Sequence, residues 1–515
     1  MRLIQPCKQL LVAAFLAGAL LLIPACGDDE TPSGPIGPGA APTIASFTAT
    51  PTTVAASGDS VELRWRTTGA TSVAIEPGVG SVTPVDSGSV KRFVSATTTF
   101  TLTATNASGS VSADASVTVS SATTITVTGR VVNTFGTPLP NTPVIISGLP
   151  PATSDGNGNF TISGVATPYD ATVVAVSTKR AIIYKGLSRP DPTLYSVDLT
   201  LISFPNTATV SGTISGGTGF PEPMNHRTHV AFGSDEGSGG TTANSTSGAY
   251  SFTTGWGGPT TTTGTIHALQ WQESAGLPVT YKGYGTKETV ALANGGTFLA
   301  QNVTMSPIPT VNMTGNVTVP TGYTLSSKTV SVLLGLAGSI VVLSDFSSSL
   351  SFTYQTPNIP GKSLQFQARA TSSLGTSLAW KVGLAPDASS VSITVPASPS
   401  QSLPVDGATN VDTTTTFSWT PLAGGIHMVY FNTGGTDPDY YVLTAGASAT
   451  IPNLNAIGLA LPPSKAYTWN LLGFAPFATL DDAAGPSGFI PPQGVNQTAD
   501  GVITTSILRN FTTKP

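Results

Sequence analysis

The sequence predicts an all-β protein: a tandem array of about five β-sandwich modules that follow an N-terminal export signal. Charged residues make up 9% of the chain, whereas hydrophobic residues make up 39% and alternate with Thr and Ser. Threonine and valine both favour a pleated surface, and threonine covers the solvent face of a strand without adding charge. The 55 Gly and 41 Pro separate these short segments with turns. A chain of this length can bury several cores without disulfides.

The N-terminus has the layout of a removable export signal. Arg2 and Lys8 give it a positive start, and an apolar stretch begins at Leu10. That stretch is shorter than the roughly 20 residues of a membrane-spanning helix. Small residues then lead to Cys26, and this junction resembles the lipobox of bacterial lipoproteins. The resemblance implies that residues 1–25 are removed and that the thiol of Cys26 is lipidated; the alternative is a plain secretory signal with an incidental cysteine.

Residues 26–42 comprise the lipidated Cys26 and a tether that is acidic at first and then rich in Pro and Gly. Such a composition cannot form a packed core, so the tether is expected to be semi-extended. In lipoproteins an Asp after the lipidated cysteine resembles an inner-membrane retention signal, and here Gly27 follows instead. The resemblance therefore implies a chain anchored through its lipid to the bacterial envelope, at the outer membrane or cell surface.

Residues 43–120 show the period-2 alternation of half-buried strands. Val61, Leu63 and Trp65 point one way and charged neighbours point the other. No strand here is long enough to stand alone, so two sheets must close over one core. The early Trp and the late segment TFTLTATNASG resemble a bacterial immunoglobulin-like domain without its inter-sheet cysteine pair, and Trp65 is expected in the core.

A diverged repeat occupies the middle of the chain. Each unit opens with a glycine-containing strand, at Gly129, Gly212 and Gly315, and continues with an aromatic strand and an apolar strand. The first unit reads VTGRVVNTFGTPLPNTPVIISG and then SDGNGNFTISGV, and it resembles the carboxypeptidase regulatory-like family, a transthyretin-like sandwich. In that family the module carries no catalytic residues. The three predicted modules comprise residues 121–203, 204–306 and 307–397.

Residues 398–515 form the last predicted module. An early strand places Phe417 and Trp419 on one face, and the segment LPPSKAYTW follows later. That segment resembles the late strand entry of fibronectin type III domains. The resemblance implies a tyrosine corner, in which the hydroxyl of Tyr467 bonds to upstream backbone and Leu461 packs against its ring. Trp419 and Trp469 are expected in the core.

Composition excludes several classes of chemistry. Cys7 lies within the signal, so the mature chain has no free thiol, which removes cysteine nucleophiles and Cys-ligated zinc. The net charge is −5 and no basic run follows Lys8, so nucleic acid is not an expected partner. There is no Gly-x-Ser-x-Gly elbow, no His-Glu-x-x-His and no Gly-rich loop joining a strand to a helix. The sequence therefore predicts no enzyme and no cofactor.

The histidines suggest a metal site only weakly. His226, His229 and His267 could supply imidazoles to a metal-dependent hydrolase. Residues 226–232 are expected to form a strand, however, and positions three apart on a strand point to opposite faces. Polar strand or loop histidines are therefore favoured and no metal is expected. His427 is expected on the wet face of a strand.

Residues 155–159 offer a second weak metal signal. Asp155, Asn157 and Asn159 place oxygen ligands at alternate positions, as at the start of a calcium loop. The later bidentate Glu is missing and a strand follows at Phe160. A tight hairpin turn is therefore the favoured interpretation.

Aromatic residues outside the strand pattern suggest a ligand site. Trp256 lies in TTGWGGPTTTTG, and Tyr281 and Tyr284 lie in TYKGYGTK, both expected to be loops. Flat aromatic faces on sandwich loops bind sugars by stacking on their rings. The alternative is that Trp256 plugs the end of its own sandwich.

Three functions remain open on the sequence alone. The first is a non-enzymatic, monomeric surface lipoprotein, a stalk for adhesion, presentation or structural spacing that contacts the membrane through its lipid. The second is a carbohydrate- or polymer-binding lipoprotein that uses Trp256 and Tyr284, with a glycan or an envelope protein as partner. The third is the metal-dependent hydrolase at His226, His229 and His267.

Overall fold

The computed structural model describes residues 39–54, 58–119, 124–133, 136–196, 204–335, 338–486 and 499–515. It is an all-β tandem array of sandwiches, as the sequence predicts. The chain divides into two compact units, Met1–Ala122 and Thr123–Pro515. The signal, Cys26 and most of the tether lie outside the described residues. In the part that is described, no helix is long and apolar enough to cross a membrane.

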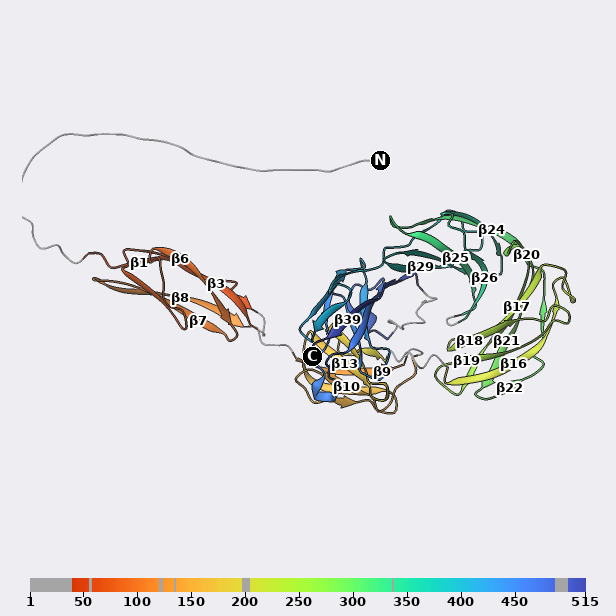
Figure 1. Ribbon diagram of the computed structural model, residues 1–515, viewed down its shortest axis with the longest axis horizontal. Helices are drawn as coiled ribbons and strands as arrows, with labels where there is room; N and C mark the ends of the chain where they lie inside the picture. The colour runs from red at the N-terminus through yellow and green to blue at the C-terminus, as the bar shows by residue number, and fades with distance from the viewer. Residues whose placement is uncertain are drawn as a thin grey trace, which may run out of the picture. The chain divides into compact units, whose positions relative to one another are not determined.

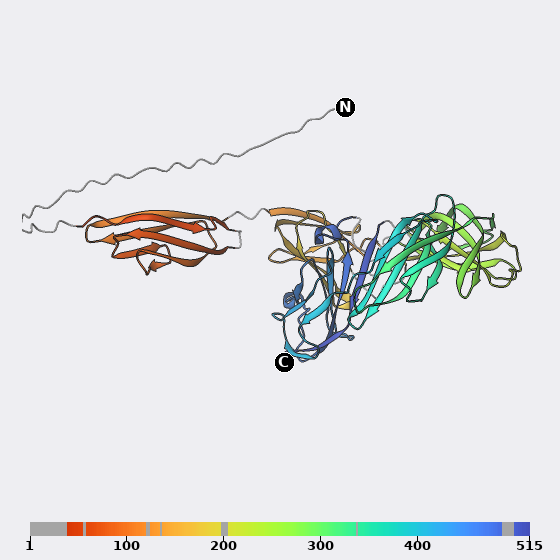
Figure 2. The ribbon, with the colours of Figure 1, turned by 90° about the horizontal axis from the view of Figure 1, so that it is seen from above.

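The first unit is a sandwich of two sheets, seen as two layers in Figure 2. One sheet has the order β1-β3-β6 and the other β2-β8-β7-β4-β5. The strands are β1 (Thr43–Thr50), β2 (Thr53–Val54), β3 (Asp59–Thr68), β4 (Ser72–Glu76), β5 (Gly80–Ser81), β6 (Ser87–Val94), β7 (Thr98–Asn106) and β8 (Gly109–Val119).

Strict alternation explains the core of this unit. Val61 and Leu63 of β3 are fully buried and Trp65 is 4% exposed. Phe100 and Leu102 of β7, in the opposite sheet, meet them in one apolar cluster. The sequence prediction for these strands is therefore confirmed.

The outer face of β7 and β8 is covered by hydroxyl groups that pair across the two strands. Thr101 donates to the carboxylate of Asp114 at 2.7 Å. The other pairs join two hydroxyls each: Thr99 with Ser116 at 2.9 Å, Thr103 with Ser112 at 3.0 Å, and Thr105 with Ser110 at 2.7 Å. Cross-strand hydroxyl pairs stabilise a sheet modestly. They show how a chain with so few charges presents a polar surface.

The second unit holds four further modules, which are named here by their described residues. The first repeat module (124–196) contains β9 (Thr124–Val132), β10 (Pro143–Ile146), β11 (Ala152–Thr153), β12 (Asn159–Ala166), β13 (Tyr169–Ala175), η1 (Val176–Thr178), β14 (Arg180–Leu187) and β15 (Thr193–Tyr195). The second repeat module (206–305) contains β16 (Asn206–Gly216), β17 (His226–Gly233), β18 (Gly237–Thr242), β19 (Ala249–Trp256), β20 (Thr261–Ser274), β21 (Leu277–Ala293), β22 (Thr297–Phe298) and β23 (Val303–Met305).

The remaining two modules complete this unit (Figure 1). The third repeat module (310–394) contains β24 (Thr310–Thr318), β25 (Thr324–Leu333), β26 (Ser339–Asp345), β27 (Ser351–Pro357), β28 (Leu364–Ser372), β29 (Gly375–Leu384) and β30 (Val391–Thr394). The last module (400–513) contains β31 (Ser400–Leu403), β32 (Ala408–Val411), β33 (Thr416–Thr420), β34 (Ile426–Asn432), β35 (Asp439–Thr444), β36 (Ser448–Thr450), η2 (Asn455–Ile457), β37 (Ala466–Ala475), α1 (Leu480–Ala483), β38 (Gly501–Ser506) and β39 (Arg509–Thr513).

One sheet of 14 strands runs through three of these four modules. Its main path is β11-β10-β13-β14-β35-β34-β37-β38-β29-β28-β25-β26. Strands of the last module therefore lie between those of the first and third repeat modules. The sequence predicts a row of modules in chain order and does not reveal this arrangement.

The first repeat module joins the last module through parallel strands. β14 pairs with β35 from Arg180↔Asp439 to Tyr184↔Leu443. Ile182 and Tyr184 share a buried apolar cluster with Met428 and other residues of the last module. Because this cluster draws on both modules, neither core is complete alone.

The third repeat module joins the last module through β38. This strand pairs with β37 of its own module and with β29 of the third repeat module. Both pairings are antiparallel, so β38 has a hydrogen-bonded neighbour on each side.

The second and third repeat modules share a core instead of a sheet. β17 and β20 of the second repeat module are apolar on both faces: Val230 and Ile266 pack in the module's own core, whereas Ala231 and Leu269 pack in the core of the third repeat module. Strands covered on both faces lose the simple alternation of half-buried strands.

Candidate functional site

The three histidines of the second repeat module do not gather into a metal site. His226 and His229 lie on β17 and His267 on β20, where His267 pairs with Ala231. The described residues include no group of three or more His, Cys, Asp or Glu side chains placed to hold a metal. The strand expected for residues 226–232 is present. The metal ligands that the hydrolase hypothesis requires are therefore not brought together.

His267 instead forms a buried pair with Tyr284. Its Nδ1 lies 2.7 Å from the Tyr284 hydroxyl, and the two rings are stacked with centroids 6.0 Å apart. Burial lowers the pKa of His267 to about 4, and the Lys362 ammonium acts in the same direction. The ring is therefore neutral near pH 7, beside the core that the second and third repeat modules share.

The aromatic residues expected on loops lie on strands, and the loop prediction is wrong. Trp256 ends β19, is fully buried, and donates from Nε1 to the Pro259 carbonyl at 2.9 Å. Tyr281 lies on β21, is 2% exposed, and packs against Trp271. Tyr284 follows it on β21 and is half-buried. Trp256 packs in the core of its own sandwich, as the alternative interpretation predicts. The three rings present no exposed face on which a sugar could stack.

Glycines interrupt the strand pattern of both segments. Gly255 and Gly285 nevertheless lie within strands β19 and β21. A Cβ at Gly255 would meet the ring of Phe204, and one at Gly285 would meet the backbone of Thr304. These glycines permit close packing of a neighbouring segment.

Residues 155–159 form a tight turn, as expected, but not a hairpin. β11 before the turn pairs with β10, whereas β12 after it pairs with β9 in another sheet, so the hairpin part of the prediction is wrong. Asp155 Oδ1 accepts from the backbone N–H groups of Asn157 and Asn159, each at 2.8 Å. These bonds, first that from Asn159, lower the pKa of Asp155. Gly158 has a φ of +77°, which favours glycine. The Asp155 carboxylate therefore stabilises the turn by accepting these hydrogen bonds.

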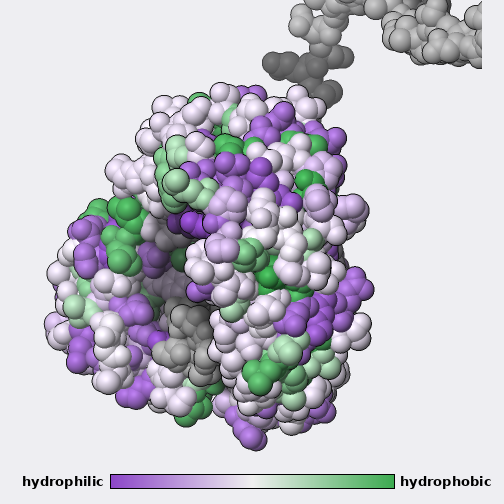
Figure 3. Space-filling view, turned by 90° about the vertical axis from the view of Figure 1, so that its right-hand side faces the viewer, coloured by the Kyte–Doolittle hydropathy of each residue, from purple (hydrophilic) through white to green (hydrophobic). Residues whose placement is uncertain are grey.

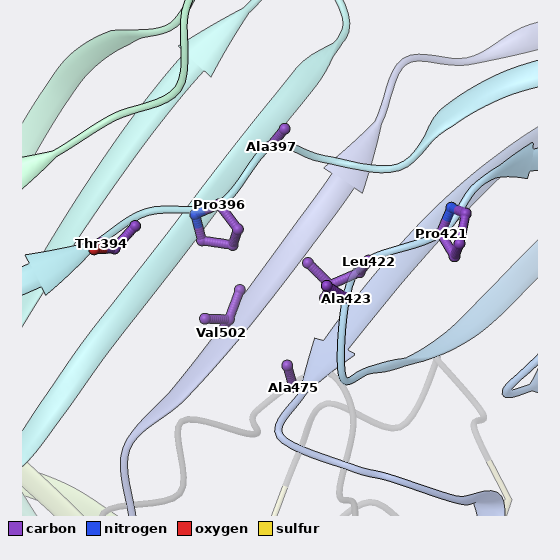
Figure 4. A pocket seen from close by; sticks show the side chains of 8 residues that line it. All are labelled: Thr394, Pro396, Ala397, Pro421, Leu422, Ala423, Ala475 and Val502. Atoms are coloured by element: carbon purple, nitrogen blue, oxygen red, sulfur yellow. The ribbon is translucent and has the colours of Figure 1, made fainter.

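A shallow pocket of about 390 Å³ lies between the third repeat module and the last module (Figure 4). Its lining comes from the segment after β30, the loop before β34, and strands β37 and β38. It is formed by short side chains, among them Pro396, Ala397, Leu422, Ala475 and Val502. None of the lining residues is titratable. The pocket therefore has no group for acid–base or nucleophilic chemistry.

His427 is buried near this pocket and not on a wet face, so that prediction is wrong. It is 0% exposed, and its Nε2 accepts from the Leu422 backbone N–H at 2.9 Å. β34 pairs with β35 and β37, and six of its seven residues are buried. Burial lowers the pKa of His427 to about 4 against the opposing effect of backbone hydrogen bonds. The ring holds the loop that carries Leu422.

A buried charge pair in the third repeat module was not found from the sequence. The Nζ of Lys328, on β25, is fully buried and lies 3.1 Å from Asp345 Oδ2 at the end of β26. It also donates to the carbonyl oxygens of Ser347 and Ser349 at 3.0 and 2.8 Å. Tyr354, on the facing sheet, donates to Asp345 at 2.6 Å. Although burial acts to raise it, these hydrogen bonds bring the pKa of Asp345 down to about 2.

That cluster joins the loop that carries Ser347 and Ser349 to both sheets of the third repeat module. Its polar groups are used in these bonds. The lysine ammonium has four acceptors around it, because the hydroxyl of Ser347 lies 3.1 Å away as well. Because these acceptors enclose the fully buried Nζ, the lysine is not placed to attack a substrate. On the face shown in Figure 3, hydrophilic and hydrophobic residues are interspersed in small groups.

No family profile and no curated protein matches this chain. Among solved structures, it is similar to the I-band fragment I67-I69 from titin, at 10% identity over 69% of this chain and 99% of that one, with a TM-score of 0.15. It is also similar to the N-terminal four Ig domains of Dscam1 isoform 8.4, at 10% identity over 64% and 96%, with a TM-score of 0.14. Sidekick-1 immunoglobulin domains 1-5 align at 10% identity over 92% and 98%, with a TM-score of 0.13. Scores this low carry no argument about function, which therefore rests on the residues.

Proposed function

We propose that this protein is a non-enzymatic lipoprotein of the bacterial envelope, anchored by an acylated Cys26. It presents a multi-module β-sandwich body for adhesion or structural spacing at the outer membrane or cell surface. Within this proposal the first unit is immunoglobulin-like, the three repeat modules are carboxypeptidase regulatory-like, and the last module is fibronectin type III-like. The tyrosine corner expected at Tyr467 gains no support from its hydrogen bond, because the hydroxyl donates at 2.8 Å to the Pro438 carbonyl in the connection between β34 and β35 and not to the backbone a few residues upstream.

The observation that carries the proposal is the way in which four modules are fused side to side. Two junctions are made by strand pairing and a third by a shared apolar core. Buried backbone hydrogen bonds and apolar contacts resist bending far better than a linker does. A body of this kind suits a mechanical or presenting role.

The chemistry of the described residues supports a role without catalysis. The deeply buried histidines His267 and His427 each bond to a neighbouring group in a core. The apolar pocket contains no titratable side chain. No observation favours the hydrolase, and the buried Trp256 removes the basis of the glycan-stacking hypothesis.

Mass spectrometry of the mature N-terminus tests the anchor. The chain, expressed with its leader in a bacterial host, should yield an N-terminal peptide that begins at Cys26 and carries the mass of a diacylglyceryl group. A Cys26→Ser variant should lack that mass and leave the membrane fraction. A full-length chain in the cytosol with its leader attached would contradict the proposal.

Whole cells test the presenting role. Protease added to intact cells should degrade the wild-type chain if its modules face the outside. Crosslinking on the same cells should then capture an envelope protein or a surface glycan. Complete protection from protease in intact cells would place the body inside the envelope and contradict surface display.

A further inference from the structure

Exposed aliphatic side chains gather at one place in the second unit. Thirteen large apolar side chains among the described residues are exposed, and five of them lie on three neighbouring segments at or near strand ends. These five are Leu374 at 50%, Leu403 at 58%, Val405 at 62%, Ile507 at 42% and Leu508 at 62%. They are called the aliphatic turn patch below.

Hydrogen bonds hold the three segments together. Leu374 lies in the turn between β28 and β29, and its carbonyl accepts from the Ile507 N–H at 3.2 Å. Ile507 and Leu508 connect β38 to β39. The patch thus extends across the junction of the third repeat module and the last module, which β38 and β29 form.

Arg509 fixes the third segment beside the other two. Its Nη1 donates to the carbonyl oxygens of Ser402 and Pro404, at 3.2 and 3.0 Å, on either side of Leu403. Asp406 Oδ1 accepts from the Asn510 N–H at 2.6 Å. Arg509 and Asp406 are thereby engaged with backbone, and the five aliphatic side chains remain exposed.

The chemistry of the patch fits a fluid apolar phase better than a protein partner. Protein interfaces concentrate their binding energy in aromatic and arginine anchors that fill pockets. The patch contains no aromatic residue and no arginine, and the neighbouring Arg509 is used for positioning. Its members lie on turns, in a connecting segment and at the end of β31. The apolar pocket near Val502 lies at the opposite end of β38 from Ile507. Aliphatic groups on turns can enter the interfacial region of a bilayer without a complementary surface.

We infer that the aliphatic turn patch is a second membrane contact, which inserts into the surface of a lipid bilayer. The choice of a bilayer as occupant rests on the proposed function, since an acylated Cys26 would keep the patch at high effective concentration near lipid. Binding is driven by apolar burial and not by charge, because the chain carries a net charge of −5. It is therefore insensitive to salt.

Flotation with vesicles tests this contact without the anchor. The full mature chain with Cys26→Ser carries no acyl group, so any flotation with pure phosphatidylcholine vesicles reports the protein surface alone. We expect part of the protein to float, at low and high salt alike. Replacing Leu403 and Leu508 together by Ser should lower the vesicle-bound fraction about ten-fold, because several apolar carbons are lost from the contact.

The matched control removes equally exposed apolar groups elsewhere. Leu299 and Phe346 are 67% and 78% exposed and lie outside the patch. Replacing both by Ser in the Cys26→Ser chain should leave the bound fraction and the melting temperature unchanged. The patch variant should also melt as the parent does, since its residues are exposed.

Three results would overturn the inference. They are no flotation of the Cys26→Ser chain, an equal loss in the Leu299/Phe346 control, or self-association that the patch substitutions abolish. The last would make the patch an interface between copies of the chain. The N-terminal mass remains a separate readout, so failure here is distinguishable from failure of the proposed lipid anchor.

Discussion

The guanidinium of Arg189, after β14, donates from Nη1 to the carbonyl oxygen of Asp481 in α1 at 2.7 Å. The carboxylate of Asp481 accepts in return from the backbone N–H groups of Ser188 and Arg189, at 2.9 and 3.2 Å. These bonds join the first repeat module to the last module across most of the chain. They accompany the β14–β35 pairing and the apolar cluster that includes Leu480.

Asp481→Ala should destabilise the second unit. The substitution removes the acceptor of two backbone N–H groups, one exposed and one part-buried, so water replaces part of the bonding and the expected cost is about 0.5–1.5 kcal/mol. Thermal unfolding of the Cys26→Ser chain measures the change. Asp387→Ala, at an exposed position, is the matched control. Equal melting temperatures for the two variants would show that the Asp481 bonds do not stabilise the junction.

Asp345→Asn should have a larger effect. It leaves the fully buried ammonium of Lys328 without its counter-ion, and breaking a buried ion pair costs about 3–5 kcal/mol. The double variant Lys328→Met/Asp345→Asn should recover much of that loss, because no uncompensated charge remains. Urea unfolding of the three proteins gives the comparison. A double variant less stable than Asp345→Asn would contradict this explanation.

Stability should fall as the pH decreases from about 6.5 to about 4. His267 and His427 keep a pKa near 4 in the folded chain, against an ordinary value of 6.5. Between these values the unfolded chain binds protons that the folded chain does not, so stability rises with pH there. Each of these histidines contributes about 3 kcal/mol to this change. His267→Gln should remove its own share in unfolding curves measured at several pH values.

Trp256→Ala should lower the melting temperature. The side chain fills the core of the second repeat module, and truncating a buried Trp costs about 3–5 kcal/mol. An exposed ligand platform would behave differently: binding would be lost and melting preserved. Calorimetry of wild type and variant distinguishes the two, with Phe346→Ala as an exposed aromatic control.

Alternating strands were predictable from the sequence and strands covered on both faces were not. Val61, Leu63 and Trp65 alternate with charged residues, and this alternation predicts that their side chains face the core. By contrast, β34 and β35 read IHMVYFN and DYYVLT, and nearly all of their residues are buried. Continuous apolar runs signal strands in the middle of a covered sheet, and they mark where modules fuse. The continuous apolar run around His427 could have predicted that this side chain is buried.

Which module neighbours which could not be predicted. β14 and β35 pair although they are far apart in the sequence. The period of a strand indicates only which of its side chains face the core and not which strand lies beside it. The buried Lys328 was missed because its partner Asp345 becomes a neighbour only through strand register. Likewise, a glycine required by a close approach, as at Gly285, looks the same in sequence as a glycine in a turn.

The insertion of the last module between the first and third repeat modules has a consequence for biogenesis. A polypeptide is synthesised from its N-terminus, so β14 leaves the ribosome long before β35 has been made. During that interval the apolar side of the first repeat module has no cover, and it needs a chaperone or a delay in folding. Nonsense mutations near the 3′ end of the gene should therefore be as harmful as early ones.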